Sequence, residues 1–185
     1  MATHEQQPTL ATKRLLLRPF ALADAPRVQQ LARAREIADV TLHIPHPYED
    51  GMAEAWIRTH QPSFRDGRSV SFAIVRRSDN LLCGAVSIGI DPDNSHAELG
   101  YWIGVPYWRQ GYGTEAAQAM LRYGFEDLNL HRIYAHHFAR NPASGRIMQK
   151  IGMTYEGCLR QHVRKWDAFE DLIQYGILRS EWQAA

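Results

Sequence analysis

The stretch Trp108-Arg109-Gln110-Gly111-Tyr112-Gly113-Thr114-Glu115 lies between a strand-like segment and a strongly amphipathic one. Its two glycines let the backbone approach a ligand closely, because neither residue carries a Cβ atom. If a helix begins here, its free N–H groups and its dipole favour an anion at the turn. We therefore predict a turn that binds phosphate or pyrophosphate. The alternative is a tight glycine-rich turn that holds no ligand.

The segment after the turn, residues 114–128, predicts an amphipathic helix. Its apolar residues recur on one stripe, and charged and amide side chains fall largely outside that stripe. Three segments before the turn are separated by runs of Ser, Asp, Asn and Pro, which favours an antiparallel meander. The predicted strands of this meander are 69–77, 81–90 and 97–105.

The remaining segments extend this pattern on both sides. Pro19 ends a first strand over 15–20, and Asp24 occupies the N-cap position of a helix with Pro26 in its first turn. Elsewhere we expect a loop over 41–48, helices over 52–64 and 144–151, a strand over 131–138, and a hairpin over 154–163 and 169–178. This order predicts a mixed α/β fold with a mostly antiparallel twisted sheet of about seven strands, flanked by helices.

The chain has 185 residues, of which 45% are apolar, and this is typical of one globular domain. We expect a flexible tail over 1–12 and a single domain over 13–185. The net charge of +1 provides no broad basic surface for nucleic acid. No apolar run approaches the roughly 20 residues that span a bilayer, so no membrane partner is expected. The polar N-terminus has no signal-peptide pattern, and a cytoplasmic location is expected.

Two other phosphate-binding motifs fit the glycine turn poorly. A P-loop needs a lysine directly after its second glycine, but Gly113 is followed by Thr114. The dinucleotide-binding fingerprint fits Gly111, Gly113 and Ala116, but it also needs an acidic residue about 20 residues later, at the end of the next strand. That strand instead ends in His136-His137-Phe138-Ala139-Arg140.

An ordered set of short stretches covers nearly the whole chain. The stretches are Thr12–Pro19, Ala97–Ile103, Trp108–Ala116, Asn141–Ser144, Ile151–Gly157, Tyr175–Leu178 and Glu181-Trp182. In this order and at this spacing they resemble the GNAT N-acetyltransferases, and within them the branch of ribosomal-protein N-terminal acetyltransferases. The general GNAT pattern has Arg or Gln three residues before the first glycine. This chain has Trp108, which is usual in the ribosomal branch.

The resemblance implies the GNAT fold, with acetyl-CoA as the co-substrate. It implies that the pyrophosphate binds the backbone at Arg109, Gln110, Gly111, Tyr112, Gly113 and Thr114. The pantetheine arm would pair like an extra strand with the backbone of Ile103, Gly104 and Val105. By the same resemblance, Asn141 contacts this arm, and a backbone N–H near Ile103 donates to the oxyanion.

Acetyl transfer requires loss of a proton from the amine and departure of the thiolate. By the resemblance, Glu98 acts as a base through water and Ser144 protonates the thiolate. The alternatives are a solvated glutamate at a strand end and a serine that caps its helix. An α-amine has a pKa near 8, whereas a lysine amine near 10.4 would cost about 4 kcal/mol to deprotonate, so a water-relayed carboxylate favours an α-amine acceptor.

We expect the acceptor to bind a face built by residues 37–64 and by the basic hairpin tip 160–166. The expected acceptor is the N-terminus of a peptide or protein, for example a ribosomal protein. A polyamine and an aminoglycoside remain alternatives, although they would need a cluster of carboxylates. A non-catalytic acyl-CoA-binding module is a further alternative, and a homodimer is left open.

Histidine and cysteine residues offer two other chemistries that we do not expect. His131, His136 and His137 have no carboxylate or cysteine in their segment to complete a metal site, so no metal is expected. Cys83 and Cys158 form no Cys-x-x-Cys pair, and neither has a histidine in its own segment to activate it. A direct transfer without a covalent enzyme intermediate is therefore predicted.

Overall fold

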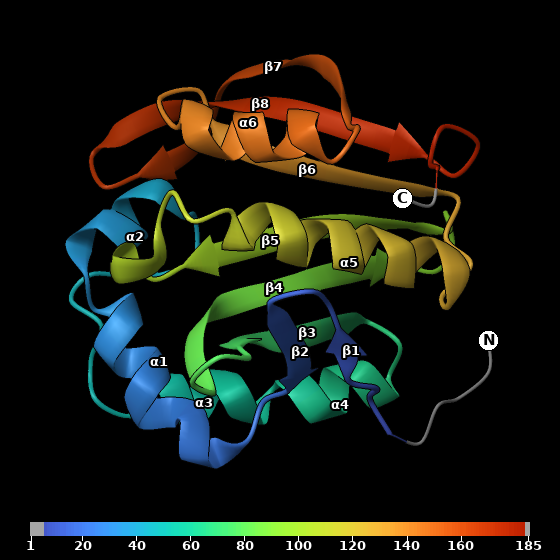
Figure 1. The fold of residues 1–185 in the computed structure, drawn as a ribbon. Helices are drawn as coiled ribbons and strands as arrows, with labels where there is room; N and C mark the ends of the chain where they lie inside the picture. The colour runs from blue at the N-terminus through green and yellow to red at the C-terminus, as the bar shows by residue number, and fades with distance from the viewer. Residues whose placement is uncertain (1–5, 184–185) are drawn as a thin grey trace.

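A computed structural model describes residues 6–183 and contains one eight-stranded sheet, in the order β1-β2-β3-β4-β5-β6-β8-β7 (Figure 1). The strands are β1 (Leu10–Ala11), β2 (Leu15–Pro19), β3 (Ser69–Arg76), β4 (Leu81–Asp91), β5 (His96–Ile103), β6 (Arg132–Phe138), β7 (Thr154–Lys165) and β8 (Ala168–Leu178). The helices are η1 (Leu22–Asp24), α1 (Ala25–Ala32), α2 (Arg35–Val40), α3 (Met52–Arg58), α4 (His60–Arg65), η2 (Val105–Tyr107), α5 (Tyr112–Glu126) and α6 (Pro142–Lys150). The predicted mixed α/β fold is confirmed, with β1 as an additional strand.

The N-terminal segment differs from the sequence prediction in two places. Residues 10–11, expected in a flexible tail, pair with β2 and form β1, while residues 1–5 of that tail lie outside the described part. Asp24 does not cap α1 with its side chain. Its carboxylate accepts hydrogen bonds from Arg18 (2.7 Å to both Nη1 and Nη2) and from the N–H of Ala21 (2.8 Å). The bidentate pair holds the carboxylate because charge-assisted hydrogen bonds are stronger than neutral ones.

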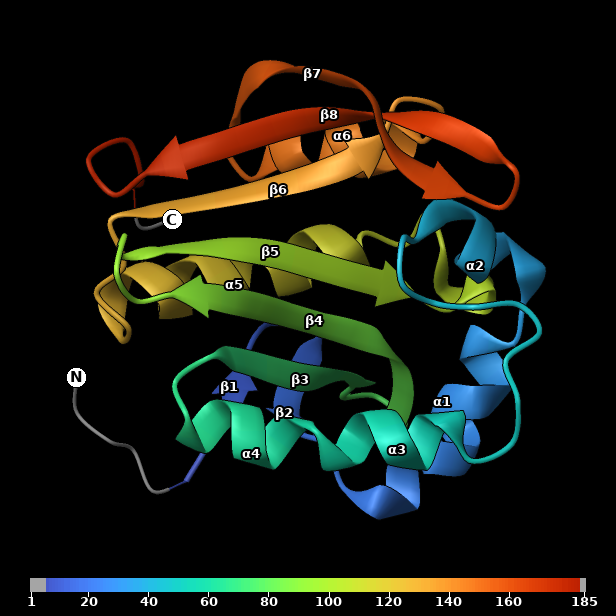
Figure 2. The same cartoon turned by 180° about the vertical axis from the view of Figure 1, so that it is seen from behind.

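The helix predicted over 52–64 is divided into α3 and α4 at Thr59. Pro62 has no N–H to continue the helical hydrogen bonds, and Thr59 Oγ1 donates to the carbonyl of Trp56 (2.7 Å). The two short helices can therefore follow the surface of the sheet beside β3 (Figure 2).

Helices cover both faces of the sheet, with α5 and α6 on one face and α3 and α4 on the other (Figures 1 and 2). Residues 70–75 of β3 are consequently all buried, on both sides of the strand. When helices cover both faces of a sheet, the side chains on both sides of a strand are buried, and the strand is then mostly apolar along its whole length. Among the described residues, no helix is long and apolar enough to cross a membrane.

The pairing of β5 with β6 is the parallel one in this sheet, and the other neighbouring strands pair antiparallel. A parallel pair needs a crossover, and α5 provides it. The pairing covers only residues 96–98 of β5, although β5 continues to Ile103 and β6 to Phe138. Beyond residue 98 the two strands diverge (Figure 2), and one edge of β5 is left without a strand partner.

Gly84 allows β4 to approach β5 closely. Gly84→Ala should destabilise the fold by about 3 kcal/mol, because the added Cβ would lie 2.2 Å from the backbone oxygen of Trp102. Gly89→Ala on the same strand is the matched control, since nothing lies within 4 Å of its Cβ. Its stability should change by less than about 1 kcal/mol. Urea unfolding measures both variants, and equal stabilities would contradict the close approach at Gly84.

Candidate active site

A cavity of about 1010 Å³ opens where β5 and β6 diverge. Its walls come from α5 and α6 on one face of the sheet and from the segment after α2 together with α3 on the other. Side chains alternate along β5, so Tyr101 reaches α6 whereas Glu98 lies on the opposite face. The cavity therefore joins the two faces of the sheet, and its volume lies at the upper end of the range for ligand sites.

The glycine turn begins α5 and lines the cavity. Gly111 is the N-cap with a φ of 80°, a left-handed conformation that favours glycine. The amides of Tyr112, Gly113 and Thr114 are the first three of α5 and have no acceptor within the helix. These donors and the helix dipole favour an anion at this end of the cavity.

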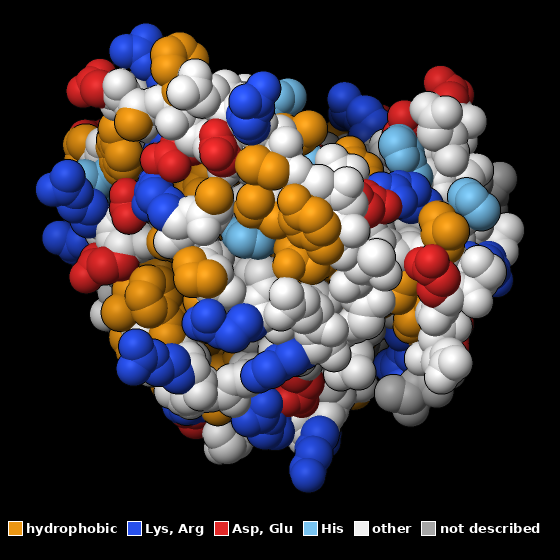
Figure 3. Space-filling view, turned by 90° about the horizontal axis from the view of Figure 1, so that it is seen from above, with side chains coloured by type: hydrophobic (Ala, Val, Ile, Leu, Met, Phe, Trp, Pro, Cys, Tyr) orange, Lys and Arg blue, Asp and Glu red, His pale blue; other side chains and the backbone are white. Residues whose placement is uncertain are grey.

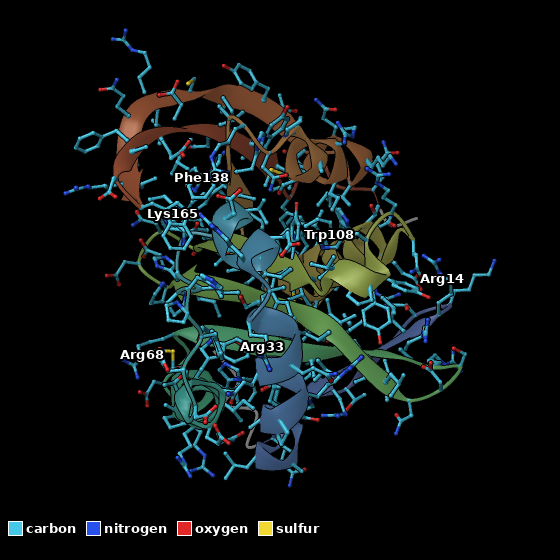
Figure 4. All side chains as sticks on the ribbon, turned by 90° about the vertical axis from the view of Figure 1, so that its left-hand side faces the viewer. Arg14, Arg33, Arg68, Trp108, Phe138 and Lys165 are labelled. Atoms are coloured by element: carbon cyan, nitrogen blue, oxygen red, sulfur yellow. The ribbon has the colours of Figure 1, made fainter. Side chains whose placement is uncertain are left out.

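Arg14, between β1 and β2, braces the turn, and sequence reasoning did not single it out (Figure 4). Its Nη1 donates to the carbonyl of Gln110 (2.8 Å), its Nε donates to Glu115 (2.6 Å), and its guanidinium lies 4.8 Å from the centre of the Tyr112 ring. Gln110, one of the residues predicted to contact the pyrophosphate, does not itself line the cavity, and its carbonyl faces Arg14. The only signal for Arg14 was its place in the first stretch of the family resemblance.

The edge of β5 faces the cavity at fewer residues than predicted. The N–H of Gly104 points toward β4, where it donates to the carbonyl of Cys83 (2.8 Å). Backbone groups alternate in direction along a strand, so Tyr101 and Ile103 are the residues whose backbone faces the gap instead. Gly104 and Val105, predicted to pair with the pantetheine arm, do not line the cavity. The chain turns into η2 directly after Ile103, which removes both residues from the edge.

The α6 wall brings together Asn141, Ser144 and Tyr101, and all three line the cavity. Asn141 is the N-cap of α6. Ser144 Oγ lies 2.9 Å from the Tyr101 hydroxyl, which also donates to the Ser144 carbonyl (3.1 Å). The alternative of Ser144 as a helix cap is therefore wrong, because its side chain bonds a hydroxyl of β5. Burial raises the pKa of Tyr101 to about 12, so its hydroxyl keeps its proton.

On the opposite face, Glu98 is paired with His136 of β6. His136 Nδ1 lies 3.2 Å from Glu98 Oε1, and both side chains line the cavity. The hydrogen bond with His136 holds the pKa of Glu98 below its usual value, and the hydrogen bond with Glu98 holds the pKa of His136 above its usual value. Glu98 is therefore not an isolated strand-end glutamate. His136, considered only as a metal ligand in the sequence, is its partner.

The second face of the cavity has an apolar wall. The residues after α2 and on α3 that form it include Leu42, Ile44, Pro45, Met52 and Trp56. Among the described residues that line the cavity, Glu98 is the only carboxylate. Part of the segment 37–64 therefore lines the cavity, and the acidic residues of that segment do not.

The hairpin tip 160–166 supports this wall and does not line the cavity. Lys165 is buried, and its Nζ donates to the carbonyls of Leu42 (3.3 Å) and Ile44 (3.0 Å) beside α2 (Figure 4). Burial lowers the pKa of Lys165. The predicted basic acceptor surface is thus wrong at this residue, since its charge is turned inward to hold the loop. Figure 3 shows the molecule from above relative to Figure 1, and on this face Lys and Arg side chains are mixed with acidic and apolar ones.

Neither cysteine is placed to carry the acetyl group. Cys83 is buried in β4, and burial raises the pKa of its thiol to about 11, which makes the thiolate scarce. Cys158 lies exposed on β7. Neither residue lines the cavity. The described residues include no group of three or more His, Cys, Asp or Glu arranged for a metal.

Comparison with known proteins places this geometry in a family. The model of the acetyltransferase (GNAT) domain matches residues 14–154. The N-acetyltransferase YnaD of Bacillus subtilis, itself uncharacterised, is 32% identical over 174 residues, which cover 94% of this chain and 98% of YnaD. The ribosomal-protein-serine acetyltransferase of Escherichia coli is 31% identical over 103 residues, which cover 55% of this chain and 57% of that protein.

A solved structure of RimL, a ribosomal L7/L12 alpha-N-protein acetyltransferase in complex with coenzyme A, has the same fold. Its TM-score is 0.85 at 19% sequence identity, and the match covers 92% of this chain and 98% of that one. The domain match and the nearly full-length similarity to YnaD agree with the glycine turn, the crossover helix and the gap in the sheet. The chain therefore belongs to the GNAT acetyltransferase family and is an acetyl-CoA-dependent N-acetyltransferase.

Proposed function

We propose that this enzyme transfers the acetyl group directly from acetyl-CoA to the α-amine of a peptide or protein N-terminus. The observation that carries the proposal is the gap between β5 and β6. It connects an anion-binding helix end on one face of the sheet with Glu98 and His136 on the other. A thioester in this gap would meet an amine that enters from the second face.

The residues of the first face fit the parts of acetyl-CoA. The free amides of Tyr112, Gly113 and Thr114, with the side chain of Arg109, suit the pyrophosphate. The edge of β5 that has no strand partner, at Tyr101 and Ile103, suits the pantetheine amides, which can add to it as a strand would. The Ile103 carbonyl on this edge also accepts a hydrogen bond from Trp108 Nε1 (2.6 Å). Asn141, on the wall across from this edge, offers a further polar contact.

The chemistry requires one bond to form and one to break. The amine nitrogen forms a bond to the acetyl carbon, a water beside Glu98 takes the nitrogen's proton and passes one to the Glu98 carboxylate, and the C–S bond breaks with its electron pair on sulfur. Ser144 would donate a proton to that thiolate and regain one from solvent, and the Tyr101 hydroxyl, which keeps its own proton, positions Ser144. Positioning and proton transfer of this kind each contribute several kcal/mol to lowering the barrier.

The acceptor side suits a single amine with apolar or neutral neighbours. A polyamine or an aminoglycoside carries several ammonium groups, and one carboxylate in the cavity would leave most of them unpaired. The E. coli relative named for a ribosomal-protein serine and the RimL structure named for an α-N-protein substrate support a peptide acceptor.

Arg109→Asn should weaken acetyl-CoA binding about tenfold without unfolding the protein, because one charge-assisted phosphate contact is worth about 1.5–3 kcal/mol before solvent screening. Asn tolerates the left-handed backbone at this residue (φ 62°), so the turn is retained. A bulky residue at Gly111 would instead strain the backbone whether or not a ligand is bound. Calorimetry with acetyl-CoA measures the affinity, and Arg109→Lys is the charge-retaining control. Unchanged affinity of Arg109→Asn at low salt would remove Arg109 from the site.

Glu98→Gln should lower kcat about 10²-fold at pH 7 and leave the Kd for acetyl-CoA nearly unchanged. The loss should shrink as the pH rises through the pKa of the amine near 8, because the nucleophile is then already neutral. Steady-state rates from pH 6 to pH 10 measure this. A loss that stays constant over that range would show that Glu98 only positions the substrate.

A peptide with one α-amine and neutral or acidic flanks should exceed spermidine and kanamycin in kcat/KM. The reason is the single carboxylate of the cavity, which can offset one ammonium group. Thiol release measured across an amine panel decides the order. Arg164→Glu is a control that should leave KM unchanged, since Arg164 lies outside the cavity and its side chain is 63% exposed. A tenfold preference for spermidine or kanamycin would overturn the acceptor assignment and leave the acetyltransferase standing.

A further inference from the structure

Small residues lie beside Glu98 on the face of the sheet that it occupies. Side chains on one face of a strand are two residues apart, so Gly100 and then Trp102 follow Glu98 along β5. The register places Ser87 of β4 opposite Gly100. Ala85 lies opposite Trp102 in the same way, and all of these residues line the cavity. Two residues of a strand span about 7 Å, so the floor next to the carboxylate is formed by a glycine and a serine.

The space above Gly100 is open. A Cβ atom added at Gly100 would meet only Ser87 Oγ among the described atoms within 4 Å, and that distance of 3.5 Å is an ordinary contact. Just past the end of β5 the situation is different, because a Cβ added at Gly104 would lie 2.8 Å from the side chain of Leu31 of α1. The cavity therefore has a pocket in its floor beside Glu98, and the pocket is closed toward the end of the strand.

The wall across from this floor is apolar and uncharged. Met52 and Trp56 line the cavity from α3, which lies on this face of the sheet (Figure 2). Among the described cavity-lining residues between positions 28 and 56, none is Asp, Glu, Lys or Arg. The Trp56 ring is held by Phe20 and His60, at 5.1 Å and 4.4 Å between ring centroids. Burial lowers the pKa of His60 to about 4, so this support is neutral at pH 7. Such a pocket favours an apolar group over a charged one.

We propose that the pocket between Gly100 and the wall of Met52 and Trp56 is the subsite for the side chain of the acceptor's first residue, and that it takes an apolar side chain of leucine or methionine size. The inference rests on the proposed transfer to an α-amine. The amine and the side chain of a first residue leave the same Cα atom. An amine held near Glu98 by one water therefore leaves its side chain within reach of Gly100, which becomes a specificity-determining residue.

The first test compares peptides that differ only in their first residue, which is glycine, alanine, serine or leucine. The leucine peptide should exceed the glycine peptide in kcat/KM by about tenfold or more, because one methylene group in an apolar pocket already changes this constant by about tenfold. Thiol release from acetyl-CoA measures each rate. Equal values for leucine and glycine, or a preference for serine, would overturn the proposal.

Gly100→Ala should lower the ratio of kcat/KM between the leucine and glycine peptides about tenfold, because the added methyl group occupies part of the pocket. The ratio is insensitive to the amount of folded enzyme, so a purely structural effect would not change it. Gly89→Ala is the matched control, since Gly89 lies opposite Glu98 and outside the cavity lining, and its ratio should be that of the wild type. An unchanged ratio in Gly100→Ala would overturn the assignment of this glycine.

The second test needs no turnover. In protein labelled at the methionine methyl groups, NMR has one probe on the apolar wall, Met52, and one on the α6 wall, Met148. With CoA present, leucinamide should shift the Met52 signal and leave the Met148 signal in place, whereas glycinamide should shift neither. Met52→Leu and Met148→Leu assign the two signals. Leucinamide that shifts Met148 alone, or neither signal, would contradict the location of the subsite.

The outcomes separate this inference from the proposed function. If peptides are acetylated at equal rates whatever their first residue, the pocket does not select the side chain, and transfer to an α-amine stands. If no peptide is acetylated, the proposed α-amine acceptor fails together with the assignment to a first residue. A Met52 shift with leucinamide would then still support an apolar subsite for another amine.

Discussion

The site depends on the early end of the parallel pairing between β5 and β6. Three residue pairs hold the strands together, and beyond them β5 continues for five residues with its outer edge unpaired. An unpaired edge inside a domain carries N–H and C=O groups that need partners. A ligand that presents alternating amides can satisfy them. The same divergence opens the sheet, so that groups on its two faces reach one cavity.

The two faces provide different physical functions. On the α5 and α6 face, the free N–H groups at the start of α5 and the Arg109 side chain favour an anion, and Arg14 stabilises the turn from outside by bonding Gln110 and Glu115. On the opposite face, the Glu98 carboxylate is hydrogen-bonded to the His136 imidazole. The sheet separates the negative charge of Glu98 from the helix end that favours an anion, where like charges would repel.

The apolar wall of the cavity is held by long-range contacts that involve the hairpin of β7 and β8. Arg140 bonds Asp39 of α2 and Glu170 of β8, and Lys165 bonds two carbonyls of the loop that follows α2. A buried ammonium group is costly unless it is hydrogen-bonded, so Lys165 gains most when the loop is in place. The hairpin tip therefore helps to determine the shape of a pocket that the tip itself does not line.

The sequence by itself determined the features that depend on neighbouring residues. The glycine turn at Gly111, the helix after it and the strands 69–77, 81–90 and 97–105 follow from backbone freedom and periodicity, which are local. They also placed Glu98, Asn141 and Ser144 near the cavity, through the ordered resemblance to a family.

Only the tertiary structure decided which distant groups meet. Three features depend on where a strand ends and on which residue lies opposite it: the position of Gly104 and Val105 outside the cavity, the inward turn of Lys165, and the pairing of Glu98 with His136. Such registers are set by packing across the whole sheet, and residues far apart in the chain carry no local pattern that reveals them. This is why the sequence pointed to Glu98 but could not identify its partner.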